Sequence, residues 1–337
     1  MDINATNIPI PPSTASKTFL RMQQPLAKLT CSKSTSLEIG STYLLPFEFV
    51  VPPEIPHNAC RHLHRHEQIH SEHCQLPPSM DQRSFRQLKD RIVDYMAPEG
   101  IEITYLICLR VFESCRKTGI IRTIAEWRCP VHIHSLRKER APLLIPRKSQ
   151  FYRLSNEKKI IGGWCPQALG TLSIKTAQPA AIQSHLQSGL PATTITASLQ
   201  YTTTAQITPP ELQSIHPRLY ILTFSSLEPW PDFPDLIDSS ICPYHNVLNV
   251  RTVSLPSCQL GSIKWQTEKD LRGESIAHTA SVQVPVVFPE DAPAHLPTFF
   301  SCLVARTYSV KLSFTYRVEG QWSRTSTIEV TVPVQIC

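Results

Sequence analysis

Polar and apolar residues alternate along the stretch Lys311-Leu312-Ser313-Phe314-Thr315-Tyr316. Successive side chains of a β-strand point to opposite faces of a sheet, so this period of two predicts a strand with one buried face. A second stretch, Ile101–Phe112, is rich in β-branched and aromatic residues and also predicts a strand. Both patterns favour an all-β fold.

Further segments of strand composition recur between turns rich in proline, serine and aspartate. This rhythm is typical of antiparallel sandwiches. The sequence therefore predicts an all-β protein made of two antiparallel, immunoglobulin-like β-sandwiches. The predicted strands cover residues 43–51, 101–112, 120–124 and 129–134 in the first half, and 170–175, 193–201, 219–224, 258–266, 281–288, 308–318 and 327–336 in the second.

Composition shifts divide the chain into four parts. Residues 1–36 are rich in serine, threonine and proline and are expected to be poorly ordered. Residues 37–136 form the first predicted sandwich, which the sequence leaves open as complete or incomplete. The segment 137–164 is basic and is interpreted as an inter-domain linker. Residues 165–337 form the second predicted sandwich.

The proline and glycine content excludes several protein classes. The 337 residues include 30 prolines and only 10 glycines. Interior proline breaks helices, which argues against a helical bundle. The sequence has no GxGxxG, GxxxxGK[ST] or GxSxG motif, so it lacks the usual phosphate loops and nucleophile elbow. We therefore expect a protein without catalytic activity.

The net charge of +6 is mildly basic and suits anionic membranes or acidic partners. It falls short of a dedicated nucleic-acid binder, and we expect no nucleic-acid partner. Lysine and arginine can contact phosphate groups, arginine in a bidentate manner. A solvated linker is the alternative interpretation of the basic segment. The candidates for binding phosphate or anionic lipid are Arg137, Lys138, Arg140, Arg147 and Lys148.

Cysteine and histidine are concentrated in one short part of the first half. The candidate metal ligands there are Cys60, His62, His70 and Cys74. Zinc is bound by about four nitrogen and sulfur ligands in a tetrahedron, which this segment could supply. The spacing matches no zinc-finger template, and solvated histidines are the alternative. Zinc is the one cofactor that the sequence leaves open.

Several segments in register along residues 40–337 resemble those of arrestin-like proteins, of the fungal alpha-arrestin type. The stretch 45–52, Leu-Pro-Phe-Glu-Phe-Val-Val-Pro, resembles a strand end of the amino-terminal arrestin domain. Later segments resemble the following core strand and the carboxyl-terminal domain. These segments are Leu76-Pro77-Pro78-Ser79, 105–111, 169–174, Trp230-Pro231-Asp232-Phe233-Pro234, 296–306 and 332–336.

This resemblance implies a non-catalytic adaptor in membrane-protein trafficking. Such an adaptor binds cytoplasmic segments of a membrane transporter or receptor and recruits ubiquitination or endocytic machinery. The sequence has no Pro-Pro-x-Tyr motif, so recruitment of a ubiquitin ligase is left open. The alternatives are a zinc-binding β protein that uses residues 60–74, and a degenerate arrestin-fold protein that recruits no ligase.

The amino terminus lacks a basic region followed by an apolar one, so no signal peptide is predicted. Eleven cysteines at irregular spacing are typical of reduced thiols in a reducing compartment. We therefore expect a cytoplasmic protein. The resemblance implies peripheral association with the plasma membrane or endosomes.

Overall fold

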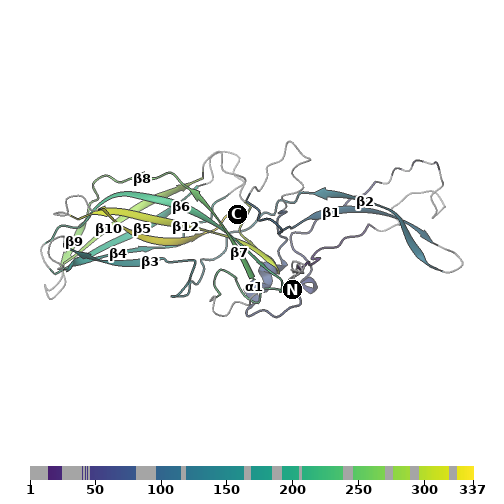
Figure 1. The fold of residues 1–337 in the computed structure, drawn as a ribbon, viewed down its shortest axis with the longest axis horizontal. Helices are drawn as coiled ribbons and strands as arrows, with labels where there is room; N and C mark the ends of the chain where they lie inside the picture. The colour runs from purple at the N-terminus through teal and green to yellow at the C-terminus, as the bar shows by residue number, and fades with distance from the viewer. Residues whose placement is uncertain are drawn as a thin grey trace, which may run out of the picture.

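A computed structural model shows an elongated, predominantly β molecule (Figure 1). A large sandwich occupies one end, a two-stranded sheet extends at the other, and helix α1 lies between them. Residues 1–13 and 25–36 of the segment expected to be poorly ordered lie outside the described part of the chain. The structure describes residues 14–24, 40, 42, 44, 46–80, 96–114, 119–162, 168–183, 192–204, 207–237, 246–269, 276–288, 296–318 and 325–337.

The first sheet of the sandwich has five strands in the order β3-β4-β5-β10-β9. All neighbouring strands in it are antiparallel. Its strands are β3 (Ser155–Ile161), β4 (Ala168–Thr176), β5 (Ala192–Thr203), β9 (Gln266–Lys269) and β10 (Ile276–Val287).

The second sheet has the order β11-β12-β6-β7, with β13 pairing with β12 and β8 pairing with β6. These pairs are also antiparallel, so the predicted antiparallel sandwich is confirmed. Its strands are β6 (Glu211–Ser226), β7 (Asn246–Ser254), β8 (Cys258–Gln259), β11 (Phe299–Phe300), β12 (Val304–Arg317) and β13 (Thr325–Val334).

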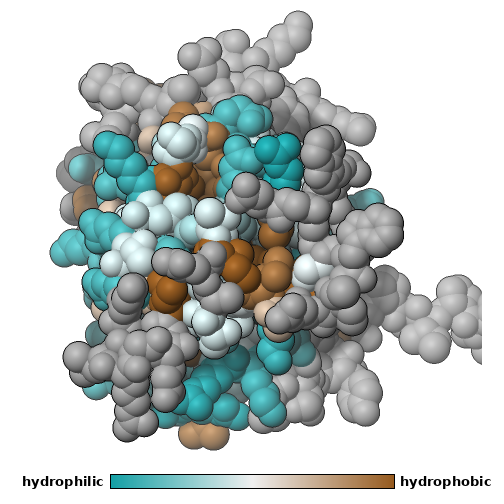
Figure 2. Space-filling view, turned by 90° about the vertical axis from the view of Figure 1, so that its left-hand side faces the viewer, coloured by the Kyte–Doolittle hydropathy of each residue, from teal (hydrophilic) through white to brown (hydrophobic). Residues whose placement is uncertain are grey.

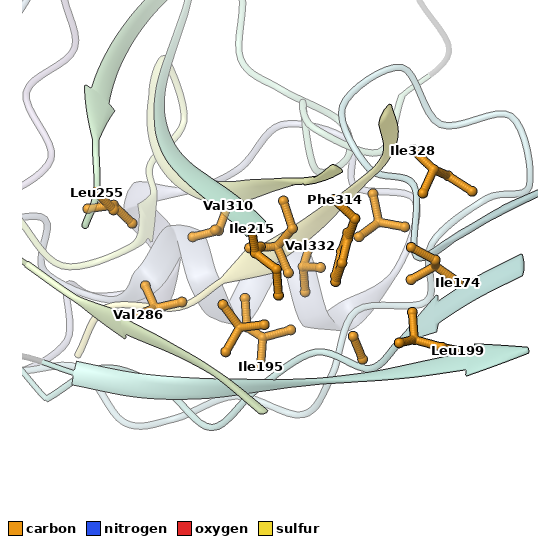
Figure 3. Close-up of a cluster of buried hydrophobic side chains, with 14 of the residues drawn as sticks. Ile174, Ile195, Leu199, Ile215, Leu255, Val286, Val310, Phe314, Ile328 and Val332 are labelled. Atoms are coloured by element: carbon orange, nitrogen blue, oxygen red, sulfur yellow. The ribbon is translucent and has the colours of Figure 1, made fainter. Parts of the chain in front are cut away.

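Side chains from the two sheets meet in one hydrophobic core (Figure 3). On β12, Leu312, Phe314 and Tyr316 are buried, whereas the intervening Ser313 and Thr315 are half-buried. The alternation in this stretch therefore predicted the buried face correctly. The core residues labelled in Figure 3 are Ile174, Ile195, Leu199 and Val286 on the first sheet, Ile215, Val310, Phe314, Ile328 and Val332 on the second, and Leu255 just after β7. The end of the sandwich far from α1 shows hydrophobic residues surrounded by hydrophilic ones (Figure 2).

One position in the first sheet requires glycine because strands β4 and β5 approach closely. A Cβ atom at Gly170 would lie 2.6 Å from the carbonyl oxygen of Thr202 and 2.6 Å from the ring of Tyr201. Both distances are shorter than van der Waals contact, so an alanine here would displace backbone or ring. The hydroxyl of Tyr201 also donates a hydrogen bond to the carbonyl of Leu169, which fixes the ring across β4.

Strand β3 lies inside the segment that we interpreted as a linker. It pairs with β4 along its length, and the residue Arg153 just before it bridges to Thr331 of β13. Residues 155–161 therefore belong to the sandwich. The lysines Lys158 and Lys159 are exposed on this strand, at the edge of the sheet. Charged side chains protect sheet edges from pairing with other chains, and this explains a strand with a linker-like composition.

Strand β7 is at an edge of the second sheet, and unlike β3 it exposes apolar side chains. Its side chains Val247, Leu248 and Val250 are exposed. The sequence analysis predicted no strand here. These two edge strands of the sandwich thus differ: β3 exposes two lysines, whereas β7 exposes three apolar side chains and Arg251.

The amino-terminal half contributes less regular structure than expected. Its elements are the 3-10 helix η2 (His57–Ala59), α1 (Glu67–Cys74), β1 (Tyr105–Ser114) and β2 (Ile121–Val131). The expected strands at 120–124 and 129–134 are joined into the single strand β2, which pairs with β1. Residues 46–51 of the expected strand 43–51 form no strand. The described part of the first predicted sandwich thus contains one two-stranded sheet.

In the described ranges of the chain, no helix has both the length and the apolar character needed to cross a membrane.

We expect Leu312→Ala to lower the free energy of unfolding by about 2–5 kcal/mol, because it leaves a cavity between the sheets. Leu144→Ala is the matched control, since Leu144 is 92% exposed and Leu312 is fully buried. Urea unfolding of both variants measures the difference. Equal losses of stability would contradict the core described above.

Candidate metal centre and basic segment

Helix α1 is short and polar, and its contacts with the sandwich hold it in place. Ile69 is completely buried in a cluster with Trp230, Phe233 and Phe300. An isolated helix of eight residues is not stable in water, so these contacts supply the stability. The helix carries three candidate ligands, His70, His73 and Cys74. His73 and Cys74 are three and four residues after His70, so both lie near it on the helix surface.

Four cysteine and histidine side chains converge where the preceding loop meets α1. The ligand atoms of Cys60, His62, His64 and His73 all lie within 4.8 Å of one another. The Cys60 Sγ atom is 3.1 Å from His62 Nε2, 3.2 Å from His64 Nε2 and 3.7 Å from His73 Nδ1. His73 Nδ1 is 3.2 Å from His62 Nε2. Cys60 and His73 are buried, and the other two are half-buried.

A second group lies beside the first and contains the other two predicted ligands. His70 and Cys74 group with His57, with ligand atoms within 4.8 Å of one another. The Cys74 Sγ atom is 3.7 Å from His70 Nε2. The structure thus divides the predicted set Cys60, His62, His70 and Cys74 between two groups. The sequence analysis did not select His57, His64 or His73.

Burial determines the protonation of the first group. Desolvation, reinforced by the neighbouring imidazoles, lowers the pKa of His73 to about 3 and that of His64 to about 4. Burial also lowers the pKa of His62. Burial, with the nearby Cys302, raises the pKa of the Cys60 thiol to about 12. At neutral pH the imidazoles are therefore uncharged, the form in which histidine binds metals.

A third cysteine reaches this region from the carboxyl-terminal sandwich. Cys302 lies between β11 and β12, and its Sγ atom is 3.5 Å from the Sγ atom of Cys60. The ammonium group of Lys17 donates to Cys302 Sγ at 3.0 Å. Sequence spacing could not reveal this neighbour, because Cys60 and Cys302 are 242 residues apart.

The first residue of the basic set is buried, and this corrects its expected role. Arg137 donates hydrogen bonds to the side chain of Gln75 and to the carbonyl of Leu76. It lies 4.0 Å from the buried carboxylate of Glu72 on α1. Burial opposes the charged form and lowers the pKa of Arg137 to about 10. Arg137 therefore cannot reach an anionic lipid surface and instead packs α1 against the chain that follows β2.

The remaining four candidates fall into two types. Arg140 is half-buried, 3.6 Å from a Glu72 oxygen and 4.8 Å from the centre of the Phe300 ring. Lys138, Arg147 and Lys148 are exposed.

Fold and site together define an antiparallel β-sandwich protein with a cysteine–histidine cluster beside its sandwich. No protein-family model and no curated protein matches the chain. Among solved structures, the chain is similar to Spo0M, a sporulation control protein from Bacillus subtilis, at 9% identity and a TM-score of 0.19. The likeness covers 48% of each chain, and at this score it carries no functional argument.

We expect Arg137→Leu to destabilise the fold by about 3 kcal/mol, because it leaves the carboxylate of Glu72 buried with one cation fewer. Lys138→Leu is the matched control, because it removes an exposed cation from the adjacent position. Chemical unfolding compares the two variants. A Lys138→Leu protein that is as unstable as Arg137→Leu would show that burial does not distinguish these residues.

Proposed function

We propose that this protein is a non-catalytic adaptor in membrane-protein trafficking, which binds extended cytoplasmic segments of a membrane transporter or receptor. The observation that carries the proposal is the two-faced character of the β1–β2 sheet. The sequence resemblance to alpha-arrestins supports the same role.

Paired residues of β1 and β2 point to the same face of their sheet, so the strand register sorts the side chains. From Tyr105 to Val111 on β1, and from Ala125 to Val131 on β2, one face carries only apolar and aromatic residues and cysteine. Leu109 pairs with Trp127 at its centre, and these side chains are 50% and 56% exposed. The apolar face consists of Tyr105, Ile107, Leu109, Val111, Ala125, Trp127, Cys129 and Val131.

The opposite face of this sheet is charged. Glu126 accepts hydrogen bonds from Arg128 at 2.6 Å and from Arg110 at 3.3 Å. Exposed ion pairs of this kind are well solvated, so these charged side chains favour contact with water. The charged face also carries the exposed Leu106, but covering it would desolvate its ion pairs, so the apolar face gains more free energy by being covered.

A two-stranded sheet alone is marginally stable in water, so its apolar face favours a partner. A β-sheet can accept an extended peptide through backbone hydrogen bonds at its edge and side-chain contacts on its face. An extended segment of a membrane protein fits both requirements. We place the protein in the cytoplasm, peripherally at the plasma membrane or endosomes. A ubiquitin ligase is the proposed second partner, recruited without a Pro-Pro-x-Tyr motif.

The exposed cations offer a contact for the membrane beside the bound segment. Lys138, Arg147 and Lys148 are all exposed. Each cation near an anionic membrane contributes about 1 kcal/mol. These three residues are the proposed phosphate or lipid contacts.

We expect Leu109→Asp to abolish capture of membrane transporters or receptors by the intact chain, because a carboxylate replaces the centre of the apolar face. Leu106→Asp is the matched control: Leu106 is a leucine of similar exposure on the charged face of the same strand. The measurement is crosslinking and affinity capture from the protein's own cells, with partners identified by mass spectrometry.

If both variants lose the same partners, binding does not depend on which face of the sheet is changed, and this would contradict the proposed binding surface. Capture of no membrane protein by a correctly folded wild-type chain would overturn the adaptor function itself. Recovery of a ubiquitin ligase with the transporter would add the second partner.

Neutralising Lys138, Arg147 and Lys148 together should weaken binding to phosphoinositide vesicles, because three exposed cations are lost. Cosedimentation of the purified chain with the vesicles measures the effect at low and physiological salt. Three exposed cations of the sandwich, Lys158, Lys159 and Lys175, are neutralised as the control. Equal sedimentation of wild type and the first triple variant would refute the lipid contact.

A further inference from the structure

We propose that Cys60, His62, His64 and His73 form a tetrahedral zinc site. This inference goes beyond the adaptor function and does not depend on it. The four residues come from two neighbouring pieces of chain, the loop before α1 and the last turn of α1.

Four of the six distances between the ligand atoms lie within about 0.5 Å of those that a tetrahedral metal ion imposes. In a tetrahedral site, Zn–S bonds of about 2.3 Å and Zn–N bonds of about 2.0–2.1 Å place ligand atoms about 3.3–3.6 Å apart. The distances between ligand atoms given above run from 3.1 to 3.7 Å. All six distances are below 4.8 Å, so small side-chain movements would bring the four atoms around a single ion.

Hydrogen bonds orient one of the imidazoles as a ligand. The Nδ1 atom of His62 is 3.1 Å from the carbonyl oxygen of Leu63. A carbonyl can only accept, so Nδ1 carries the proton and Nε2 presents its lone pair to Cys60 and His73. A histidine that binds a metal through one nitrogen typically donates the other N–H to such a carbonyl.

His73 is buried with one of its ring nitrogens facing the other ligand atoms. This residue is 1% exposed, and its Nε2 atom is buried without a hydrogen-bond partner. Its Nδ1 atom faces the lone pair of His62 Nε2 and the sulfur of Cys60. A zinc ion bound to Nδ1 would replace these two contacts with a coordinate bond, and Nε2 would then carry the proton of the ring.

The donor set selects the metal. One thiolate and three imidazoles suit zinc, whereas magnesium and calcium require oxygen ligands. Four protein ligands fill a tetrahedron, so the site leaves no position open for a substrate and is structural. It would fix residues 60–64 to α1, in a region where the described chain has only a three-residue helix, η2, before α1.

Cys302 and the second group lie next to these four residues but outside the set. Cys302 contacts Cys60 and Lys17, and His70 and Cys74 group with His57. This division gives a matched pair of variants. His64 and His70 are both half-buried, and their ring centroids are 4.7 Å apart.

The test measures zinc in the full-length chain, purified and kept reduced so that Cys60 stays a free thiol. We expect one zinc per chain by elemental analysis after dialysis, for the wild type, His70→Asn and Cys302→Ser. His64→Asn and Cys60→Ser should bind zinc at least about tenfold more weakly. Cobalt substitution adds a spectroscopic signature: tetrahedral d–d bands with a thiolate charge-transfer band that Cys60→Ser removes.

Circular dichroism of the metal-free variants shows whether a loss of zinc reflects unfolding. His64→Asn changes a half-buried residue and is the variant best suited to this comparison. A reduced wild-type chain that holds no stoichiometric zinc would overturn the proposal. So would a zinc content that His64→Asn leaves unchanged and His70→Asn removes.

Discussion

The contact between α1 and the carboxyl-terminal sandwich is the interaction on which the arrangement of the amino-terminal half depends. Ile69 packs against Trp230, Phe233 and Phe300, which belong to segments far along the chain. The neighbouring carboxylate of Glu72 is buried next to two arginines. Hydrophobic burial gives this contact its free energy, and the two arginines offset the cost of burying the carboxylate of Glu72.

Strands of the sandwich could be predicted from the sequence, because a strand with one buried face leaves a period of two. The prediction failed at two of the edge strands. Strand β3 carries exposed lysines and was interpreted as linker, and the exposed β7 was missed. Helix α1 was missed for another reason. Its stability comes from tertiary contacts of Ile69, and eight mostly polar residues carry no apolar periodicity of their own.

The sequence identified only some residues of the candidate metal site, because local composition shows neighbours in the sequence but not tertiary contacts. A local concentration of cysteine and histidine indicated Cys60 and His62, because these residues are close in sequence. The choice of the remaining partners depends on how the chain turns back through α1, and this brings His73 inward and His70 to the other group. Arg137 shows the opposite error. The basic composition of its segment predicted an exposed cation, but Arg137 is buried beside the carboxylate of Glu72. Glu72 lies 65 positions earlier, so the sequence did not reveal this contact.

Two of the edge strands of the sandwich, β3 and β7, differ in how they would meet a second copy of the chain. An edge strand presents unpaired N–H and C=O groups that another chain can extend. The lysines of β3 repel an identical strand, whereas Val247, Leu248 and Val250 on β7 would attract one. Of these two edge strands, β7, with the single cation Arg251, therefore opposes pairing with a second copy less than β3 does.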